Sequence, residues 1–311
     1  MRALTFALGA GADARLGDPP TSMHPVGLVG RAARQLWMHA PDDEVTRRQY
    51  GYAVAFAVPL ASALGASLIR RAVARKHAIF GLAFEVGLLS LTASARTLLA
   101  RASEVEAALA AGNLEVAREL LGTHLVSRDT STLTSSEVAA AAIESVAENL
   151  SDGVIAPWLA YAVGGLPAAI AYRAANTMDA LWGYRNEEFA VLGEGAARLD
   201  DLLNLVPAQA TAVALVLAAR AEGTALRALS TWRRDAQLTE SPHAGHPMSA
   251  MAGALGVRLE KRDAYVLGAG FEDATPDDLG RAIRVARRAM IIGGSAIVGA
   301  LVLRSLQRGG L

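Results

Sequence analysis

An unbroken apolar run from Tyr50 to Ile69 constrains the fold of this chain more than any other feature. Its 20 residues carry no charged side chain, and about 20 residues is the length that an α-helix needs to cross the hydrocarbon core of a bilayer. Inside that core each backbone N–H and C=O must be paired within the protein, which favours a helix. The sequence therefore predicts a membrane-spanning helix over these residues.

The composition agrees with a membrane protein. The chain is 52% hydrophobic and only 19% charged, against about 25% charged in ordinary soluble proteins. Its 30 basic and 30 acidic residues balance, and no basic patch interleaved with aromatic residues is present, so we expect no nucleic acid partner. The absence of cysteine excludes disulfides, thiolate catalysis and Cys-ligated metal centres.

Further apolar segments are shorter or interrupted, and together they predict an all-α, polytopic integral membrane protein. We treat residues 1–311 as a single membrane domain located in the inner (cytoplasmic) membrane. The first segment is interpreted as a short membrane helix or interfacial anchor in preference to a signal peptide. With Pro157, Gly164-Gly165 and Pro167, one later segment fits a broken or re-entrant hairpin at least as well as a straight span. The expected apolar segments lie near 2–12, 50–69, 78–95, 153–171, 205–219 and 289–303.

The orientation in the membrane is less clear from the sequence. Basic clusters at 70–76 and 281–288 flank two apolar segments, and the positive-inside rule places both clusters on the cytoplasmic side. Strict alternation would then put residues 95–152 outside the cell. An enzyme that uses cytosolic substrates needs them inside, so both orientations stay open.

The polar segments are predicted to be helical. Residues 95–111 and 114–121 are typical of a helical hairpin with a packing role. The sequence Thr134-Ser135-Ser136-Glu137 is a capping box, which predicts a helix that continues to about Leu150. Pro276 after Thr275 predicts the start of another helix, which continues into the last apolar segment. No alternating pattern of strand length competes with these assignments.

Three acids are placed on one face of the helix that begins at Ser135. Glu144, Glu148 and Asp152 recur at every fourth position, opposite an apolar stripe at 138, 142, 146 and 150. No lysine or arginine occurs between Asp129 and Arg173 to compensate them. Because unpaired acids repel one another unless a cation lies among them, a magnesium or nucleotide–metal site is favoured over a plain solvated face.

Other oxygen-rich side chains and several arginines accompany the three acids. Asp200 and Asn204 are four residues apart, and Asp179 follows Asn176 by three, in helix-compatible spacing. Such ligands suit a hard cation such as Mg²⁺.

No GxxxxGK[ST] phosphate loop is present, so a nucleotide would be held differently. His243 and His246 are interpreted mainly as loop packing. The arginines, whose planar donors suit phosphates or carboxylates, are Arg128, Arg173, Arg185 and Arg198.

Short polar motifs follow one another in order along nearly the whole chain. They are Gly17-Asp18-Pro19, His24-Pro25-Val26, Arg128-Asp129-Thr130, Glu144 to Asn149, Asp152-Gly153, Asn176 to Asp179, Gly183 to Asn186, Arg198 to Asp201 and Ser241-Pro242. This joint order resembles the adenosylcobinamide-phosphate synthase family of cobalamin biosynthesis. Two positions depart from the family pattern: Gln209, where arginine is favoured, and His243, where asparagine is favoured.

The resemblance implies a membrane enzyme that joins the propionate carboxylate of adenosylcobyric acid to the amine of aminopropanol or its O-phosphate, with ATP and Mg²⁺. The lipid bilayer and other late cobalamin enzymes are the expected partners. A non-catalytic membrane sensor on the same scaffold is the alternative.

The site residues that the resemblance implies fall into three groups. The expected metal ligands are Glu144, Glu148 and Asp152. The expected catalytic residues are Glu144, Glu148, Asp179, Asp200 and Asp201. The expected substrate-binding residues are Asp18, His24, Arg128, Asp129, Asn149, Arg173, Asn176, Tyr184, Asn186 and Arg198. For His24, a structural role in a turn competes equally with a contact to the corrinoid or its base.

Overall fold

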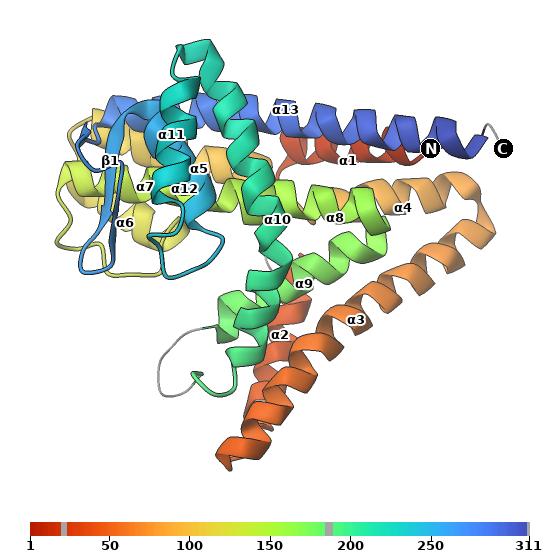
Figure 1. The fold of residues 1–311 in the computed structure, drawn as a ribbon. Coiled ribbons are helices and arrows are strands. Elements are labelled where there is room, and N and C mark those ends of the chain that lie inside the picture. The colour runs from red at the N-terminus through yellow and green to blue at the C-terminus, as the bar shows by residue number, and fades with distance from the viewer. Residues whose placement is uncertain (20–23, 184–188, 310–311) are drawn as a thin grey trace. The chain divides into compact units, whose positions relative to one another are not determined.

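The structure is a computed structural model that describes residues 1–19, 24–183 and 189–309. It is almost entirely helical (Figure 1), which confirms the all-α prediction. Within the described residues, four helical stretches are long and apolar enough to cross a membrane, which supports a multi-pass protein. They are Glu44–Lys76, Ala78–Ala110, Glu194–Glu222 and Pro276–Gln307.

Two of the expected apolar segments are not among these four stretches. The segment at 2–12 belongs to helix α1 (Arg2–Leu16), which is only 15 residues long. The segment at 153–171 is divided between α8 (Ala156–Gly164) and α9 (Leu166–Trp182). The two helices are separated at Gly165, whose φ of 74° is a conformation that glycine adopts at little cost. The expected break in this segment is therefore confirmed.

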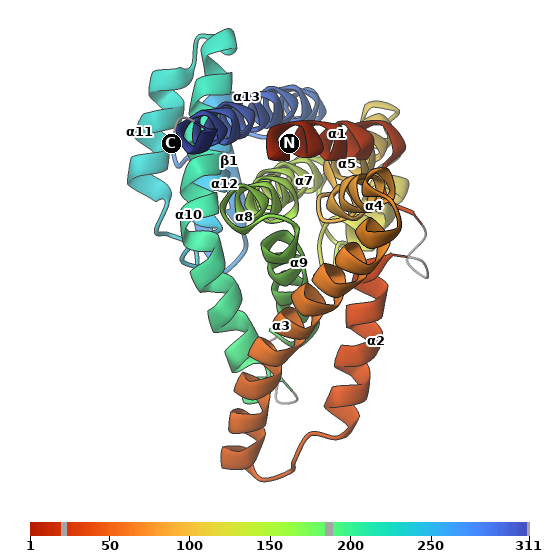
Figure 2. The ribbon, with the colours of Figure 1, turned by 90° about the vertical axis from the view of Figure 1, so that its right-hand side faces the viewer.

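Two compact units are distinguished in the chain, and each is described by itself. The first comprises Met1–Ser94, Ala156–Asn204 and Ile297–Leu311. In it, α3 (Glu44–Lys76) packs against α4 (Ala78–Ser90) and α9, and α1 packs against α4, as Figure 2 shows. Helix α2 (Pro25–Met38) packs on α9. Apolar side chains including Val54, Met178 and Trp182 form the core where these helices meet.

The second unit comprises Ala95–Ile155 and Leu205–Ala296. Helix α7 (Ser135–Leu150) contacts α5 (Ala95–Ala110), α6 (Leu114–His124), α12 (Gly245–Leu255) and strand β1 (Val257–Lys261), as Figure 1 shows. Helices α5 and α6 pack on each other, which confirms the helical hairpin. The unit also contains η2 (Ala219–Glu222) and α11 (Ala225–Asp235). Two helices continue from one unit into the other, namely α10 (Glu194–Ala218) and α13 (Pro276–Gly309). The single-domain expectation stays a prediction.

Helix α7 begins and ends where the sequence indicates. The Thr134 hydroxyl oxygen accepts from the backbone N–H of Glu137, and the Glu137 carboxylate accepts from the backbone N–H of Thr134 at 2.8 Å. This reciprocal capping box satisfies donors at the helix start that would otherwise lack partners. Helix α13 likewise begins at Pro276, as expected.

Three details of the second unit correct the sequence-based expectations. Strand β1 pairs antiparallel with β2 (Tyr265–Leu267) and parallel with β3 (Glu272–Asp273), although no strand was expected. These strands are too short for an alternating pattern to stand out. Asp152 does not continue the α-helix but lies in a π-helical turn, η1 (Ser151–Ile155). Glu144 is buried, so the solvated-face interpretation is wrong for that residue.

Candidate functional site

A cavity of about 180 Å³ lies in the second unit beside α7. The turn before the helix lines one part of it, and the Ser145 hydroxyl holds that turn by donating to the Leu125 carbonyl at 2.7 Å. The first two strands line another part. The lining residues are Leu125, Val126, Ser127, Arg128, Ala141, Glu144, Ser145, Glu148, Lys261 and Tyr265.

Glu144 is the most buried charged group of this cavity, with 5% of its surface exposed. Its Oε2 lies 3.5 Å from Nη2 of Arg128, whereas its Oε1 is buried without a hydrogen-bond partner. Burial raises the pKa of Glu144 to about 7, and this effect is opposed by Arg128, the Tyr265 hydroxyl and Lys261. A buried carboxylate oxygen that lacks a donor is suited to a cation.

Glu148 follows one helical turn later and lines the same cavity. Burial raises its pKa to about 7, and the neighbouring carboxyls of Asp152 and Glu144 add to this effect. His243 and Lys261 act in the opposite direction. Two carboxyls of this kind are difficult to ionise together, so a divalent cation between them would stabilise both negative charges.

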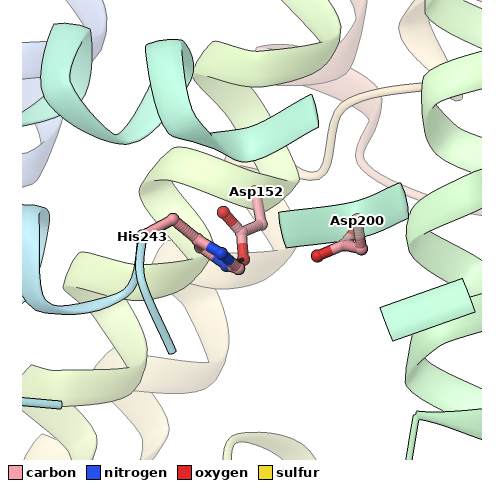
Figure 3. Close-up of side chains that lie close together, drawn as sticks. All are labelled: Asp152, Asp200 and His243. Atoms are coloured by element: carbon pink, nitrogen blue, oxygen red, sulfur yellow. Dashed lines mark ion pairs between the residues drawn. The ribbon is translucent and has the colours of Figure 1, made fainter. Parts of the chain in front are cut away.

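Asp152 lies beside His243, as Figure 3 shows. Nε2 of the buried histidine is 3.6 Å from the carboxylate, and its Nδ1 is 3.0 Å from the Ser241 hydroxyl. The sequence predicts loop packing for His243, because this residue lies in a turn-rich segment. Its contact with Asp152, an expected metal ligand, is visible only in the structure. His246 of α12 accepts a hydrogen bond from Trp232 of α11 at 2.9 Å, which agrees with the expected packing role.

A second group of expected site residues meets in the first unit. Asp200, which Figure 3 also draws, belongs to this unit and is buried. It accepts hydrogen bonds from the side-chain amides of Asn176 at 3.2 Å and Asn204 at 2.8 Å. The Asn204 carbonyl oxygen in turn accepts from the Tyr172 hydroxyl at 2.7 Å. Arg173 donates to the Asn176 side chain at 3.3 Å, so three polar residues of α9 and two of α10 form one network.

Four other expected substrate-binding residues have local partners. His24 caps α2 by accepting from the Val26 N–H at 3.1 Å, and Asp18 lies 3.5 Å from its ring, which agrees with a structural turn. The N–H and hydroxyl of Ser131 lower the pKa of the exposed Asp129. The exposed Arg198 pairs with Glu194 at 2.6 Å.

The remaining expected residues are dispersed. Asn149 is exposed and donates to the Ser145 carbonyl at 3.0 Å, while Asp179 and Asp201 are half-buried. Tyr184 and Asn186 lie outside the described residues. The functional roles expected for all these residues stay predictions.

Lys261 and Tyr265 line the acidic cavity but were not expected as site residues. Both belong to short strands, and Lys261 stands between Glu260 and Arg262 in a run that is typical of a protein surface. The sequence could have indicated these two residues only if the strands had been predicted, because the alternation of side chains along a strand shows which of them share a face.

The fold and the site together define a class: a polytopic helical membrane protein with a buried acid-and-arginine cavity in its polar part. The family model described as CobD/Cbib protein matches residues 6–290, so the chain belongs to the CobD/CbiB family of cobalamin biosynthesis proteins. This result confirms the resemblance found in the sequence.

Curated relatives agree with the family assignment. The chain is 40% identical over 304 residues to cobalamin biosynthesis protein CobD of Chromobacterium violaceum, with 94% of each chain covered. It is 35% identical to CobD of Klebsiella pneumoniae, covering 88% of this chain and 89% of the relative. It is 34% identical to cobalamin biosynthesis protein CbiB of Salmonella typhimurium, covering 92% and 93%. No solved structure matches the chain.

Proposed function

We propose that the protein is an acid–amine ligase that forms an amide between the carboxylate of adenosylcobyric acid and the amine of aminopropanol or its O-phosphate, using ATP and Mg²⁺. Membership in a family of cobalamin biosynthesis proteins supports the substrate class. The observation that carries the proposal is the buried Glu144, whose Oε1 lacks a hydrogen-bond partner in a cavity shared with Glu148 and Arg128.

The residues of the cavity fit a magnesium ion. Glu144 and Glu148 supply the carboxylate oxygens that this hard cation prefers, while Asp152 does not line the cavity but is close enough to Glu148 to raise its pKa. When bound, the ion neutralises charge on the phosphate that is transferred. Arg128 extends a guanidinium into the same cavity, where it can hold phosphate oxygens in line.

The proposed reaction proceeds in two balanced steps. An oxygen of the corrinoid carboxylate attacks the terminal phosphorus of ATP, and ADP leaves, which gives an acyl phosphate. The amine nitrogen then attacks the carbonyl carbon, phosphate leaves with one former carboxylate oxygen, and a base takes a proton from nitrogen. Asp179, Asp200 and Asp201 remain the candidates for that base. The protein is proposed to act in the cytoplasmic membrane, near other late cobalamin enzymes.

The direct test is an assay on the detergent-purified protein. Adenosylcobyric acid labelled with oxygen-18 in its carboxylate is incubated with ATP, Mg²⁺ and either amine, and the products are measured by mass spectrometry. We expect amide formation that depends on nucleotide and metal, with label in the released phosphate. Label found only in the corrinoid product, or amide formed without nucleotide, would contradict the acyl-phosphate route.

A variant separates this enzyme from the sensor alternative. Glu148→Gln removes a carboxylate from the cavity while conserving its shape, so we expect amide formation to be abolished and the thermal unfolding temperature to stay near that of the wild type. Near-normal turnover of the variant at limiting Mg²⁺ would remove Glu148 from the site. If the wild-type protein turns over neither amine, the sensor becomes the better interpretation.

A further inference from the structure

Two side chains of the short sheet share the acidic cavity with α7. Lys261 is the last residue of β1, and Tyr265 is the first residue of β2, directly paired with it across the hairpin. Both line the cavity with Glu144, Glu148 and Arg128. None of the motifs that identify the family contains either residue.

The size of the cavity limits what it can hold. Pockets for drug-sized ligands measure roughly 300–1,000 Å³, whereas this cavity measures about 180 Å³. A complete corrinoid or nucleotide cannot be contained in it, but because the cavity is open to solvent, a part of such a ligand can enter. A metal ion with one or a few phosphate groups is of a suitable size.

The charges of the cavity match such a ligand. The two carboxyls provide oxygen ligands for a cation, whereas Arg128 and Lys261 provide positive charge for phosphate oxygens. Lys261 is close enough to lower the pKa of both Glu144 and Glu148. The Tyr265 hydroxyl donates to the Met248 sulfur at 3.9 Å, which is a weak acceptor, and it lies close enough to Glu144 to lower the pKa of that carboxyl.

We infer that Lys261 and Tyr265 complete a metal–phosphate subsite: Lys261 binds the phosphate together with Arg128, and Tyr265 is a positioning residue that orients Glu144 toward the cation. This inference rests on the proposed function and specifies which part of the substrate enters the cavity. The ligand is a phosphate ester carried with a divalent cation. The terminal phosphates of a nucleotide and the phosphate of aminopropanol O-phosphate share this chemistry.

The test measures binding in the absence of corrinoid, so that it does not depend on amide formation. The full-length, detergent-purified protein is titrated with Mn²⁺ alone, with Mn²⁺ and a non-hydrolysable ATP analogue, and with Mn²⁺ and aminopropanol O-phosphate. Free Mn²⁺ is followed by electron paramagnetic resonance, and affinity for the phosphate ligands by calorimetry. Lys261→Ala, Lys261→Arg and Tyr265→Phe are compared with the wild type.

The two residues are expected to give different results. Lys261→Ala should weaken at least one phosphate ligand tenfold or more without weakening Mn²⁺ alone, and Lys261→Arg should restore most of that affinity because it keeps the charge. Tyr265→Phe should weaken Mn²⁺ alone severalfold at an unchanged unfolding temperature, since the position of Glu144 is altered and the fold is not.

Arg262→Ala is the matched control. This neighbouring basic residue donates to Glu137 at 2.8 Å and does not line the cavity. Its removal should leave the binding of Mn²⁺ and of both phosphate ligands unchanged. If Arg262→Ala weakened the phosphate ligands as much as Lys261→Ala does, the loss of any nearby positive charge would explain the result, and the inference would be overturned.

The outcomes separate the ligand sources and the two levels of the proposal. A Lys261 effect on the ATP analogue alone assigns the cavity to nucleotide phosphate, and an effect on aminopropanol phosphate alone assigns it to the acceptor. If the wild type binds neither, or if Lys261→Ala binds both normally, the subsite is wrong even where amide is formed. Lys261-dependent binding in a protein that forms no amide would retain the subsite and refute the proposed reaction.

Discussion

At the scale of single residues, the main feature is an acid held where its charge is costly. Glu144 is nearly inaccessible to solvent, and its ionic partner Arg128 lies 3.5 Å away. An ionised carboxylate in such surroundings destabilises the fold unless a cation or more donors compensate it. The cost is understandable if the residue is kept for ligand binding, because functional sites commonly hold titratable groups with displaced pKa values.

The stability of the metal-free protein should therefore depend on pH. The pKa of Glu144 is about 7 in the folded protein against an ordinary 4.5, so the folded state binds more protons between these values. The contribution of Glu144 to the free energy of unfolding is therefore fully present below pH 4.5 and is lost as the pH rises through 7. The loss is about 3 kcal/mol for a pKa difference of this size. We expect the unfolding temperature, measured in EDTA, to fall between pH 5 and 8.

Substitution of the acid provides the check on this pH dependence. Glu144→Gln should reduce the slope, Glu148→Gln should also reduce it because burial raises the pKa of that carboxyl to about 7 as well, and the double variant should flatten the profile. Glu272→Gln, a change at an exposed acid of β3, should leave the slope unchanged. A slope that is unchanged in Glu144→Gln would show that Glu144 does not contribute to the pH dependence.

Two of the arginines expected to bind substrate, Arg128 and Arg198, differ in their surroundings. Arg128 reaches into the cavity, whereas Arg198 is exposed and already pairs with Glu194 at 2.6 Å. We expect Arg128→Ala to reduce kcat/KM by a factor corresponding to about 3 kcal/mol of transition-state stabilisation. Arg198→Ala should lose less. Steady-state kinetics decides between them, and equal losses would indicate that both arginines serve one shared site.

At the scale of secondary-structure elements, small residues allow helices to approach closely. The middle of α7 contains four consecutive alanines, 139–142, all of which are buried. Gly253 has the same role between α11 and α12, because a Cβ added there would lie 2.7 Å from the Thr231 side chain and 2.8 Å from the Ala228 backbone. These contacts leave no space for even a methyl group without movement of the helices.

The substitution Gly253→Ala should therefore destabilise the protein. In an unconstrained helix the change from glycine to alanine stabilises by roughly 0.5–1 kcal/mol, but overpacking costs about 1–3 kcal/mol, so we expect a net loss. Gly299→Ala in α13, where no atom lies within 4 Å of an added Cβ, is the control and should be neutral or stabilising. Thermal unfolding in detergent measures both, and a Gly253→Ala protein as stable as the control would contradict the packing argument.

At the scale of the whole molecule, helix length and charge define how the chain crosses the membrane. Helix α3 has 33 residues and is therefore about 50 Å long, which exceeds the roughly 30 Å of the hydrocarbon core. If the helix crosses the bilayer, its two ends are expected to extend into the polar regions on opposite sides. By the positive-inside rule, the basic residues of its last turn predict that this end lies on the cytoplasmic side.

The absence of native cysteine makes this topology directly testable. Single cysteines at Arg75 and at Arg287, both exposed, should react with a membrane-impermeant maleimide from the cytoplasmic side. A cysteine at Val45, near the other end of α3, should react from the opposite side. Inside-out and right-side-out vesicles are compared by mass shift. Labelling of positions 75 and 287 from different sides would contradict the positive-inside assignment, and labelling of 45 and 75 from the same side would show that α3 does not cross.

Local signals in the sequence were sufficient for the membrane helices and for the boundaries of α7. A long charge-free run such as 50–69 requires a helix wherever it is placed in a bilayer, because backbone groups there have no other partner. The capping box at Thr134 and Glu137 forms between residues three positions apart, so it could be recognised without the rest of the protein. Glu144 and Glu148 are only four residues apart on one helix, so their shared face could also be recognised from the sequence.

Contacts between distant residues were decided only by the tertiary structure. Lys261 and Tyr265 meet the acids of α7 because a hairpin more than a hundred residues later packs on that helix, and His243 reaches Asp152 across a similar separation. Helical periodicity specifies which residues share a face, but it does not specify what covers that face. For this reason the sequence could show an acidic face, whereas only the packed fold determined that Glu144 is buried, which residues surround it and how small the cavity is.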